Sequence, residues 1–328
     1  MKFKLKKGDK IGFFSPSSPV TAISPERFMR AKKYLEDKDF ILVEGSRTGK
    51  QDFYRSGTIQ ERVEELNSLI RDPEIKCIIS TIGGLNSNSL LPYIDYEAFK
   101  KNPKIIIGYS DVTAILLGIY AKTGITTFYG PALVASFGEL PPYVDETFSC
   151  FDDIFIKNLK LPYTYKNPEF WTDEMIKWEE QDCSKTPVKN ELITLEEGKA
   201  TGRVIGGNLM TIGGFWGSPY MPDIREGDIL FIEDSLKTAG IVERNYAFLK
   251  VNGVFSKVAG VIIGKHEKFD DLGTGRKHYE IFQEVIGKLN IPVLAEFDCC
   301  HTHPMLTLPI GATIELDATN KKVTLIDF

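Results

Sequence analysis

The chain carries a serine, a pair of carboxylates and a pair of histidines, each group placed after an apolar run. The residues are Ser110, Glu233 with Asp234, and His301 with His303. A serine hydroxyl is a weak nucleophile near neutral pH and needs a base within hydrogen-bond reach. A histidine acts as that base when a carboxylate orients its other ring nitrogen. These residue types indicate nucleophilic acyl transfer, provided that the fold brings them together.

Ser110 lies where a strand is expected to turn into a helix. Residues 104–107 are mostly β-branched, Gly108 interrupts the run, and residues 112–120 carry apolar side chains at helical spacing. Such a turn raises the hydroxyl above the sheet, and the next N–H, that of Asp111, can stabilise an oxyanion. The alternative is that Ser110 or Asp111 only caps the helix, since both residue types are favoured there.

The candidate base comes from the histidines His266, His278, His301 and His303. His278 begins a predicted amphipathic helix over 278–289 and is expected at the surface, and His266 is a weaker candidate after a predicted strand. The other two follow a predicted strand over 291–297 and precede a stiff, proline-containing segment. A base must be held in one place, which favours this pair.

The candidate orienting carboxylates, Glu233 and Asp234, end a predicted buried strand over 228–232. A carboxylate in such a place needs a partner, because an unpaired buried charge is costly. The alternative for Glu233 is a surface salt bridge or a helix cap. Serine, acid and histidine all follow buried strands, and this shared placement favours a catalytic role.

Residues 1–150 alternate predicted strands and helices, a pattern that indicates an α/β fold with a mostly parallel sheet. Ligands of such sheets bind beyond the carboxyl ends of the strands. Both Gly83-Gly84 and Ser110 fall at such ends. Two adjacent glycines allow a ligand to approach the backbone, although an ordinary tight turn is the alternative.

The rest of the chain differs in character. Residues 151–195 mix aromatic and charged side chains without clean periodicity and are expected to form a linker with an aromatic loop. Residues 196–328 are expected to form an α/β domain richer in antiparallel strands, ending in a β-hairpin over 312–316 and 322–328.

The composition of the chain argues against several classes of function. The chain has 328 residues and a formal net charge of −5, without a basic arm, so nothing indicates binding to nucleic acid. No apolar run is long enough for a signal peptide or a membrane span, which predicts a cytoplasmic protein without a membrane partner. The five cysteines include no Cys-x-x-Cys pair, so neither a disulfide framework nor a metal site is expected.

Several segments, in this order, resemble the LD-carboxypeptidase family of serine peptidases, and within it the microcin C immunity branch. They are Lys-Gly-Asp-Lys-Ile-Gly at 7–12, Ser-Pro-Ser-Ser-Pro at 15–19, Gly-Gly-Leu-Asn-Ser-Asn at 83–88, Ile-Gly-Tyr-Ser-Asp at 107–111, Gly-Gly-Asn-Leu at 206–209, Phe-Ile-Glu-Asp-Ser at 231–235, and His-Thr-His-Pro-Met-Leu-Thr-Leu-Pro-Ile-Gly at 301–311.

The resemblance implies a fold, a mechanism and an assembly. It implies an N-terminal Rossmann-like domain (1–150) and a C-terminal α/β domain (196–328) on either side of the linker, with the site in the cleft between these two domains. It also implies a homodimer. It assigns Ser110 as nucleophile, His301 as general base and acid, and Glu233 as the group that orients His301. The backbone N–H groups of Gly84 and Asp111 would form the oxyanion hole. No metal or cofactor is implied.

The resemblance also implies residues that contact the substrate. They are Gly83, Asn86, Ser87, Asn208 and Trp178. A tryptophan, Trp171 or Trp178, could stack on a purine or serve as a packing anchor. The family commonly has Gly-His-Thr-Asp-Pro around the base. In this chain Cys300 and His303 replace the glycine and the aspartate.

The predicted function is hydrolysis of the link between an aminoacyl or peptidyl group and a modified adenylate. One alternative is a muropeptide L,D-carboxypeptidase that removes a terminal D-amino acid. Another, suggested by the replacements beside His301, is an impaired binding protein of the same fold. A plain nucleotide-binding protein is disfavoured, because no glycine-rich phosphate-binding motif follows the first strand.

Overall fold

The apolar runs of the first half form a mainly parallel sheet. The structure is a computed structural model that describes residues 3–157 and 159–328. The sheet has the order β14-β5-β4-β3-β1-β2, and β14 alone among its described strands runs antiparallel to its neighbour. The strands are β1 (Lys10–Phe14), β2 (Ile41–Glu44), β3 (Ile75–Ser80), β4 (Ile105–Gly108), β5 (Thr127–Tyr129) and β14 (Leu308–Ile310).

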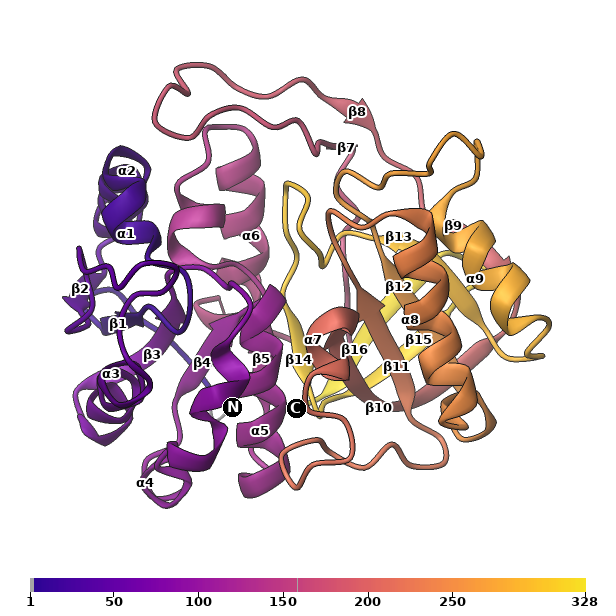
Figure 1. The fold of residues 1–328 in the computed structure, drawn as a ribbon, viewed down its shortest axis with the longest axis horizontal. Helices are drawn as coiled ribbons and strands as arrows, with labels where there is room; N and C mark the ends of the chain where they lie inside the picture. Colours follow the sequence, from indigo (N-terminus) through magenta and orange to yellow (C-terminus); the bar gives the residue numbers. More distant parts are fainter. Residues whose placement is uncertain (1–2, 158) are drawn as a thin grey trace.

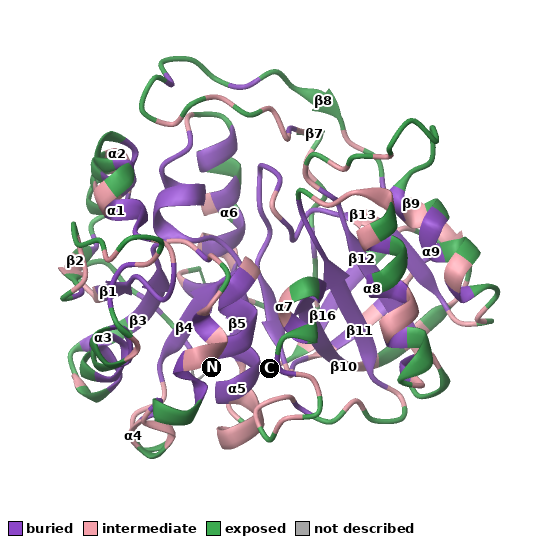
Figure 2. Ribbon diagram, in the orientation of Figure 1, coloured by how far each residue is buried: buried purple, intermediate pink, exposed green. Residues whose placement is uncertain are grey.

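Helices cover this sheet and leave its inner strands largely buried, whereas the edge strand β2 is partly exposed (Figures 1 and 2). They are α1 (Val20–Ile23), α2 (Pro25–Glu36), α3 (Ile59–Arg71), α4 (Tyr96–Lys101), α5 (Thr113–Thr123) and α6 (Tyr143–Phe155), with the shorter turns η1 (Ser87–Tyr93), η2 (Ser110–Val112) and η3 (Leu133–Phe137). α5 is apolar all round and fully enclosed over most of its length, as expected for a helix between two sheets. α6 runs through residues 150 and 151.

The second half is built on a mixed sheet with the order β6-β16-β15-β10-β11-β12-β13-β9. Its central strands β10 to β13 are parallel, and the outer strands are antiparallel. The strands are β6 (Tyr163–Thr164), β9 (Ile193–Glu196), β10 (Lys199–Asn208), β11 (Ile229–Glu233), β12 (Gly260–Gly264), β13 (Val293–Phe297), β15 (Thr313–Asp317) and β16 (Lys322–Asp327). The predicted α/β class and C-terminal hairpin are confirmed.

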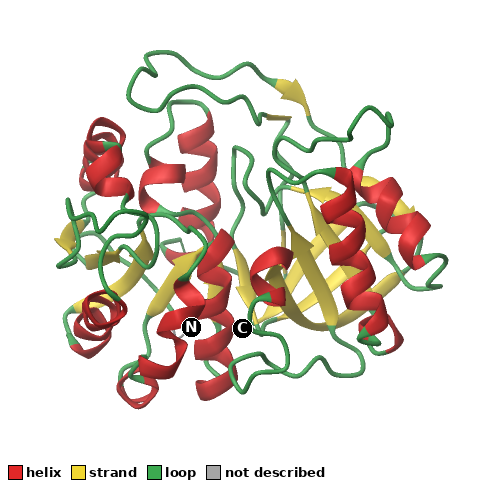
Figure 3. Cartoon of the chain, viewed as in Figure 1, coloured by secondary structure: helices red, strands yellow, loops and turns green. Residues whose placement is uncertain are grey.

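The helices of this half are α7 (Leu209–Gly213), α8 (Ala239–Val251) and α9 (His278–Ile286), with the turn η4 (Val254–Ser256). α8 and α9 pack on the sheet around a separate apolar cluster of Leu230, Val242, Leu249, Ile263 and Phe282. Sequence reasoning did not assign α8. Figure 3 shows α8 and α9 on the outer side of this sheet, and α5 and α7 between the two sheets.

The segment between α6 and β9 arches from one half to the other and includes the ribbon β7 (Phe170–Trp171) and β8 (Val188–Lys189) (Figure 1). Most of it is exposed, with short buried stretches (Figure 2). Since β14 comes from the C-terminal part of the chain and pairs with β5, the two halves share a continuous core.

Among the described residues, no helix has both the length and the apolar character needed to cross a membrane.

Candidate active site

Ser110 lies on a strained turn between β4 and the helical segment that follows. Tyr109 is extended, and Ser110 has φ 62°, a left-handed conformation that is rare for serine. Such backbone strain costs about 1–3 kcal/mol and persists only where the surroundings impose it. The strand, turn and helix are those expected of a nucleophile elbow.

The helix-cap alternative for this turn is wrong. The first residue before α5 is Val112, and no side chain caps η2 or α5. The Asp111 carboxylate instead accepts the N–H groups of Asn86 and Ser87 at 3.1 and 2.9 Å. The Ser87 hydroxyl donates to the Asp111 carbonyl at 2.5 Å. Asp111 therefore fixes residues 83–88, the glycine loop, against the turn at Ser110.

The two glycines of that loop are required by close contacts. A Cβ on Gly83 would lie 2.9 Å from the Ser110 Cβ and 3.0 Å from the Asp111 nitrogen. Gly84 has φ 150°, and a Cβ there would lie 2.2 Å from the Ser17 Oγ. The glycine pair, which could supply an oxyanion donor, therefore lies directly beside Ser110 and Asp111.

Glu233 and His301 meet at the end of β11. The His301 Nδ1 lies 2.6 Å from the Glu233 Oε2, which places the ring proton on Nδ1 and leaves Nε2 free to act as a base. Tyr109, next to the nucleophile, packs edge-on against the His301 ring with centroids 4.8 Å apart. The acid and the base that the resemblance named are thus brought together beside the elbow.

The other carboxylate oxygen of Glu233 is also occupied. Asn208 ends β10, directly beside Glu233 in the parallel register, and its Nδ2 donates to Oε1 at 3.0 Å. The Tyr129 hydroxyl donates to the same oxygen at 2.5 Å. Sequence reasoning missed Tyr129. Its only signal was its place at the carboxyl end of a predicted parallel strand.

Burial and pairing act in opposite directions on the pKa values of this pair. Burial alone would lower the pKa of His301, but the neighbouring Glu233 carboxylate outweighs it, so the His301 pKa is raised above 6.5. Burial would likewise raise the pKa of Glu233. The nearby His301 and the hydrogen bonds from His301, Tyr129 and Asn208 outweigh it, so the Glu233 pKa is lowered. Glu233 therefore stays ionised near neutral pH.

The remaining histidines have separate environments. His303 lies with its Nε2 3.6 Å from Glu139 rather than near Glu233, and burial together with the Lys185 ammonium lowers its pKa to about 3. His266 accepts the Lys237 N–H. The prediction that His278 lies at the surface is wrong, because its ring is buried with Nε2 2.6 Å from the Glu296 Oε1. That partner is remote in sequence, so helical periodicity could not reveal it.

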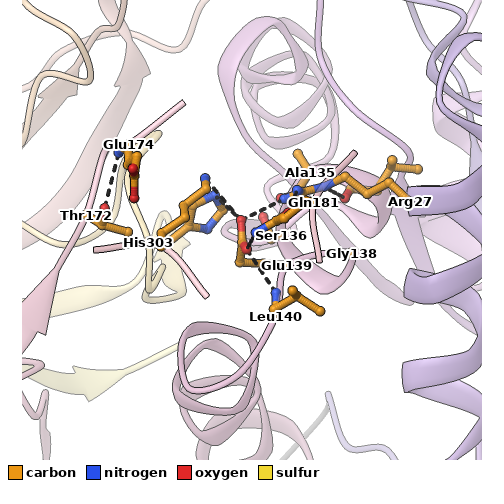
Figure 4. A network of polar contacts seen from close by, with 12 residues as sticks. Arg27, Ala135, Ser136, Gly138, Glu139, Leu140, Thr172, Glu174, Gln181 and His303 are labelled. Carbon is orange, nitrogen blue, oxygen red and sulfur yellow. Dashed lines mark hydrogen bonds and ion pairs between the residues drawn. The ribbon is translucent and has the colours of Figure 1, made fainter. Parts of the chain in front are cut away.

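Glu139 is the centre of a buried ion network beside the site. Its Oε2 is 3.0 Å from both Arg27 and Lys185, and its Oε1 accepts from Gln181 at 2.5 Å. Figure 4 shows Glu139 between His303 on one side and Gln181 and Arg27 on the other. The network holds the arching segment against α2 and against the loop that carries His301.

Two cavities meet at Ser110. One, of about 330 Å³, is lined by Ser110, His301, Trp178, Lys185 and Glu267 among others. The other, of about 210 Å³, is lined by Ser110, Asp111, Asn88, Asn208 and Lys237 among others. Between the described side chains of Ser110 and His301 there is no direct hydrogen bond. In ligand-free enzymes this contact is often loose and tightens on binding.

The predicted substrate-contacting residues fall into two groups. Gly83, Trp178 and Asn208 each line one of the cavities, and Gly84, predicted as an oxyanion-hole donor, lines both. Asn86 and Ser87 are among the described residues but line neither cavity. Their backbone N–H groups face Asp111, and the Asn86 side chain faces Arg62. Trp178 is half-buried, and the guanidinium of Arg27 lies 4.5 Å from its ring centroid. Trp171 instead lies beside Lys265, away from both cavities.

The chain is similar to known proteins over most of its length. Residues 11–130 match the model of the LD-carboxypeptidase N-terminal domain, and residues 201–316 match that of the LD-carboxypeptidase C-terminal domain. A putative carboxypeptidase of Vibrio cholerae serotype O1 is 59% identical over 98% of this chain and 96% of its own length. The microcin C7 self-immunity protein MccF of Escherichia coli is 55% identical over 98% and 94%. The structure of MccF in complex with aspartyl sulfamoyl adenosine has a TM-score of 0.97 and 54% identity, covering 100% of this chain and 98% of that one.

The raised pKa of His301 predicts the pH dependence of Ser110 reactivity. Only neutral His301 can take the serine proton, so the rate of Ser110 labelling by a fluorophosphonate should fall as the pH drops through that pKa. We expect the half-maximal rate above pH 6.5, the ordinary value. In Glu233→Gln the midpoint should move to lower pH and the maximal rate should fall about 10³–10⁴-fold. An unchanged midpoint in this variant would contradict the assignment.

The Glu139 network predicts a large effect on stability. Glu139→Gln leaves the Arg27 and Lys185 cations buried without a countercharge, so the free energy of unfolding should fall by about 3–5 kcal/mol in urea titrations. Glu180→Gln, on the arching segment that carries Lys185, is the control, because Glu180 forms an exposed pair with Lys177 and should change stability by less than about 1 kcal/mol. Equal effects of the two variants would show that the network contributes little.

Proposed function

The chain belongs to the LD-carboxypeptidase family of serine peptidases, and we propose that it hydrolyses the link between an aminoacyl or peptidyl group and a modified adenylate. The observation that carries this proposal is that His301, hydrogen-bonded to the buried Glu233, lines the same cavity as the strained Ser110. The microcin C7 self-immunity protein, 55% identical over nearly the whole chain, supports the choice of substrate class.

In the proposed reaction Ser110 attacks the acyl carbonyl while His301 Nε2 takes its proton. The charge that develops on the carbonyl oxygen would be stabilised by the N–H groups of Asp111 and Gly84. His301 then gives the proton to the leaving group, and the C–N or C–O bond to it breaks. Water, deprotonated by His301, hydrolyses the acyl-enzyme and regenerates Ser110. Glu233 remains ionised and holds the imidazolium during both steps.

The positions of the cavities suggest how such a substrate would lie. A general acid must reach the leaving group, so the leaving group belongs on the His301 side of Ser110. That side is the larger cavity, whose lining includes Trp178. The acyl group would then occupy the smaller cavity, lined by polar groups of Asn88, Asn208 and Lys237.

Trp178 gives the larger cavity a platform suited to a nucleobase. Arg27 lies near the ring centroid, and the half-buried indole also lines the cavity. Stacking of a base on an aromatic side chain is sequence-tolerant and contributes about 1–3 kcal/mol. The MccF complex with aspartyl sulfamoyl adenosine, at 54% identity, supports an aminoacyl nucleotide as the ligand class.

A second candidate is removal of a terminal D-amino acid from a muropeptide. The relative from Vibrio cholerae named as a putative carboxypeptidase, and the family's own description, favour it. The same triad would serve both reactions, so the substrate alone distinguishes them.

For either substrate we infer a homodimer, as the family resemblance implies, and light scattering after size-exclusion chromatography tests this assembly.

Hydrolysis assays with two substrates test the proposal. Wild type should release the amino acid from an aminoacyl sulfamoyl adenosine, and Ser110→Ala should lose at least about 10³-fold in kcat. Release of D-alanine from a muropeptide tetrapeptide alone would establish the second candidate. If neither compound is cleaved and both bind, the chain is a binding protein of this fold.

The stacking role of Trp178 predicts a selective effect on binding. Trp178→Ala should raise KM for the aminoacyl sulfamoyl adenosine by roughly 5- to 150-fold, the equivalent of about 1–3 kcal/mol, with a smaller change in kcat. Trp171→Ala is the matched control, since Trp171 packs beside Lys265 outside the cavities. Equal KM changes in both variants would argue for a packing role.

A further inference from the structure

Tyr129 ends β5 at the boundary between the two sheets. Its side chain is fully buried, and its ring packs edge-on against Phe231 with centroids 5.2 Å apart. Its backbone pairs with Gly108 on one side and with Leu308 on the other. The ring is therefore held by strands from both parts of the chain and has a fixed orientation.

The Tyr129 hydroxyl makes two hydrogen bonds of opposite sense. It accepts the Ser110 N–H at 3.0 Å and donates to the Glu233 Oε1 at 2.5 Å. A backbone N–H can only donate and an ionised carboxylate can only accept, so the single hydroxyl proton points toward Glu233. Burial, together with the neighbouring carboxylate, raises the tyrosine pKa well above 10, so the hydroxyl keeps this proton.

This hydroxyl thus joins the backbone of the strained nucleophile to the carboxylate that orients the base. We propose that Tyr129 is a positioning residue that keeps Ser110 and His301 in their reactive geometry through these two hydrogen bonds. It lines neither of the two cavities at Ser110, so its effect should be on the chemical step and not on substrate binding. The kinetic part of this proposal rests on the proposed function, whereas the bridge itself does not.

Tyr129→Phe tests the proposal, because it removes the hydroxyl and keeps the ring. We expect kcat to fall by about 10- to 100-fold, the range found when the hydrogen-bond partners of metal-ligating side chains are removed, with KM changed less than about 3-fold. Tyr165→Phe is the matched control. Its ring is also almost fully buried and its hydroxyl donates to the Thr307 carbonyl at 2.9 Å, so this variant loses one buried hydrogen bond away from the triad, whereas Tyr129→Phe loses two.

Two readouts do not depend on the natural substrate. The rate of fluorophosphonate labelling of Ser110 should fall in Tyr129→Phe and stay near wild type in Tyr165→Phe. The His301 Nδ1 lies 2.6 Å from a carboxylate oxygen, so the proton on this nitrogen should give a downfield NMR resonance that is absent in His301→Gln. This resonance should move in Tyr129→Phe and not in Tyr165→Phe.

The outcomes separate the two proposals. If wild type labels at Ser110 but cleaves neither substrate, the proposed function fails, and labelling and the resonance still decide the role of Tyr129. If Tyr129→Phe loses thermal stability like Tyr165→Phe but keeps the wild-type labelling rate and resonance, Tyr129 is only a core residue. That result would overturn the proposal.

Discussion

The buried carboxylate of Glu233 is the constraint on which the site depends. A carboxylate removed from water must have its oxygens satisfied by donors, or its burial would be strongly unfavourable. Here the donors are His301, Tyr129 and Asn208, which come from three different parts of the chain. Satisfying the Glu233 carboxylate oxygens therefore requires the ends of β5, β10 and β11 and the loop after β13 to converge, and this convergence forms the proposed active site.

The same convergence explains why Ser110 can keep a strained conformation. Tyr129 holds the Ser110 N–H, and Asp111 fixes the glycine loop through Asn86 and Ser87. Farther out, the Glu139 network ties the arching segment and the His301 loop to the first half. The Glu139 network thus restricts the segments that carry the hydrogen-bonding residues, and these hydrogen bonds restrict Ser110. Such support maintains a reactive geometry in a site formed between two sheets.

Much of this arrangement could be predicted from the sequence because strand ends are marked locally. β-Branched runs followed by glycine, or by Glu233, located the strand ends, and parallel topology implied that they share an edge. Local sequence patterns do not reveal contacts between side chains that are far apart in the sequence. They did not reveal that His278 is buried against Glu296, nor that Tyr129 bridges Ser110 and Glu233. The domain limits at residues 150 and 195 remain predictions.

The most direct test of this account compares the two neighbouring histidines as bases for Ser110. The measurement is the rate of fluorophosphonate attachment, located on its peptide by mass spectrometry, in His301→Gln and His303→Gln. The account predicts attachment at Ser110 in wild type, a rate lower by about 10²–10⁴-fold in His301→Gln, and a rate near wild type in His303→Gln. Attachment at another residue, or a loss confined to His303→Gln, would contradict a Ser110–His301–Glu233 triad.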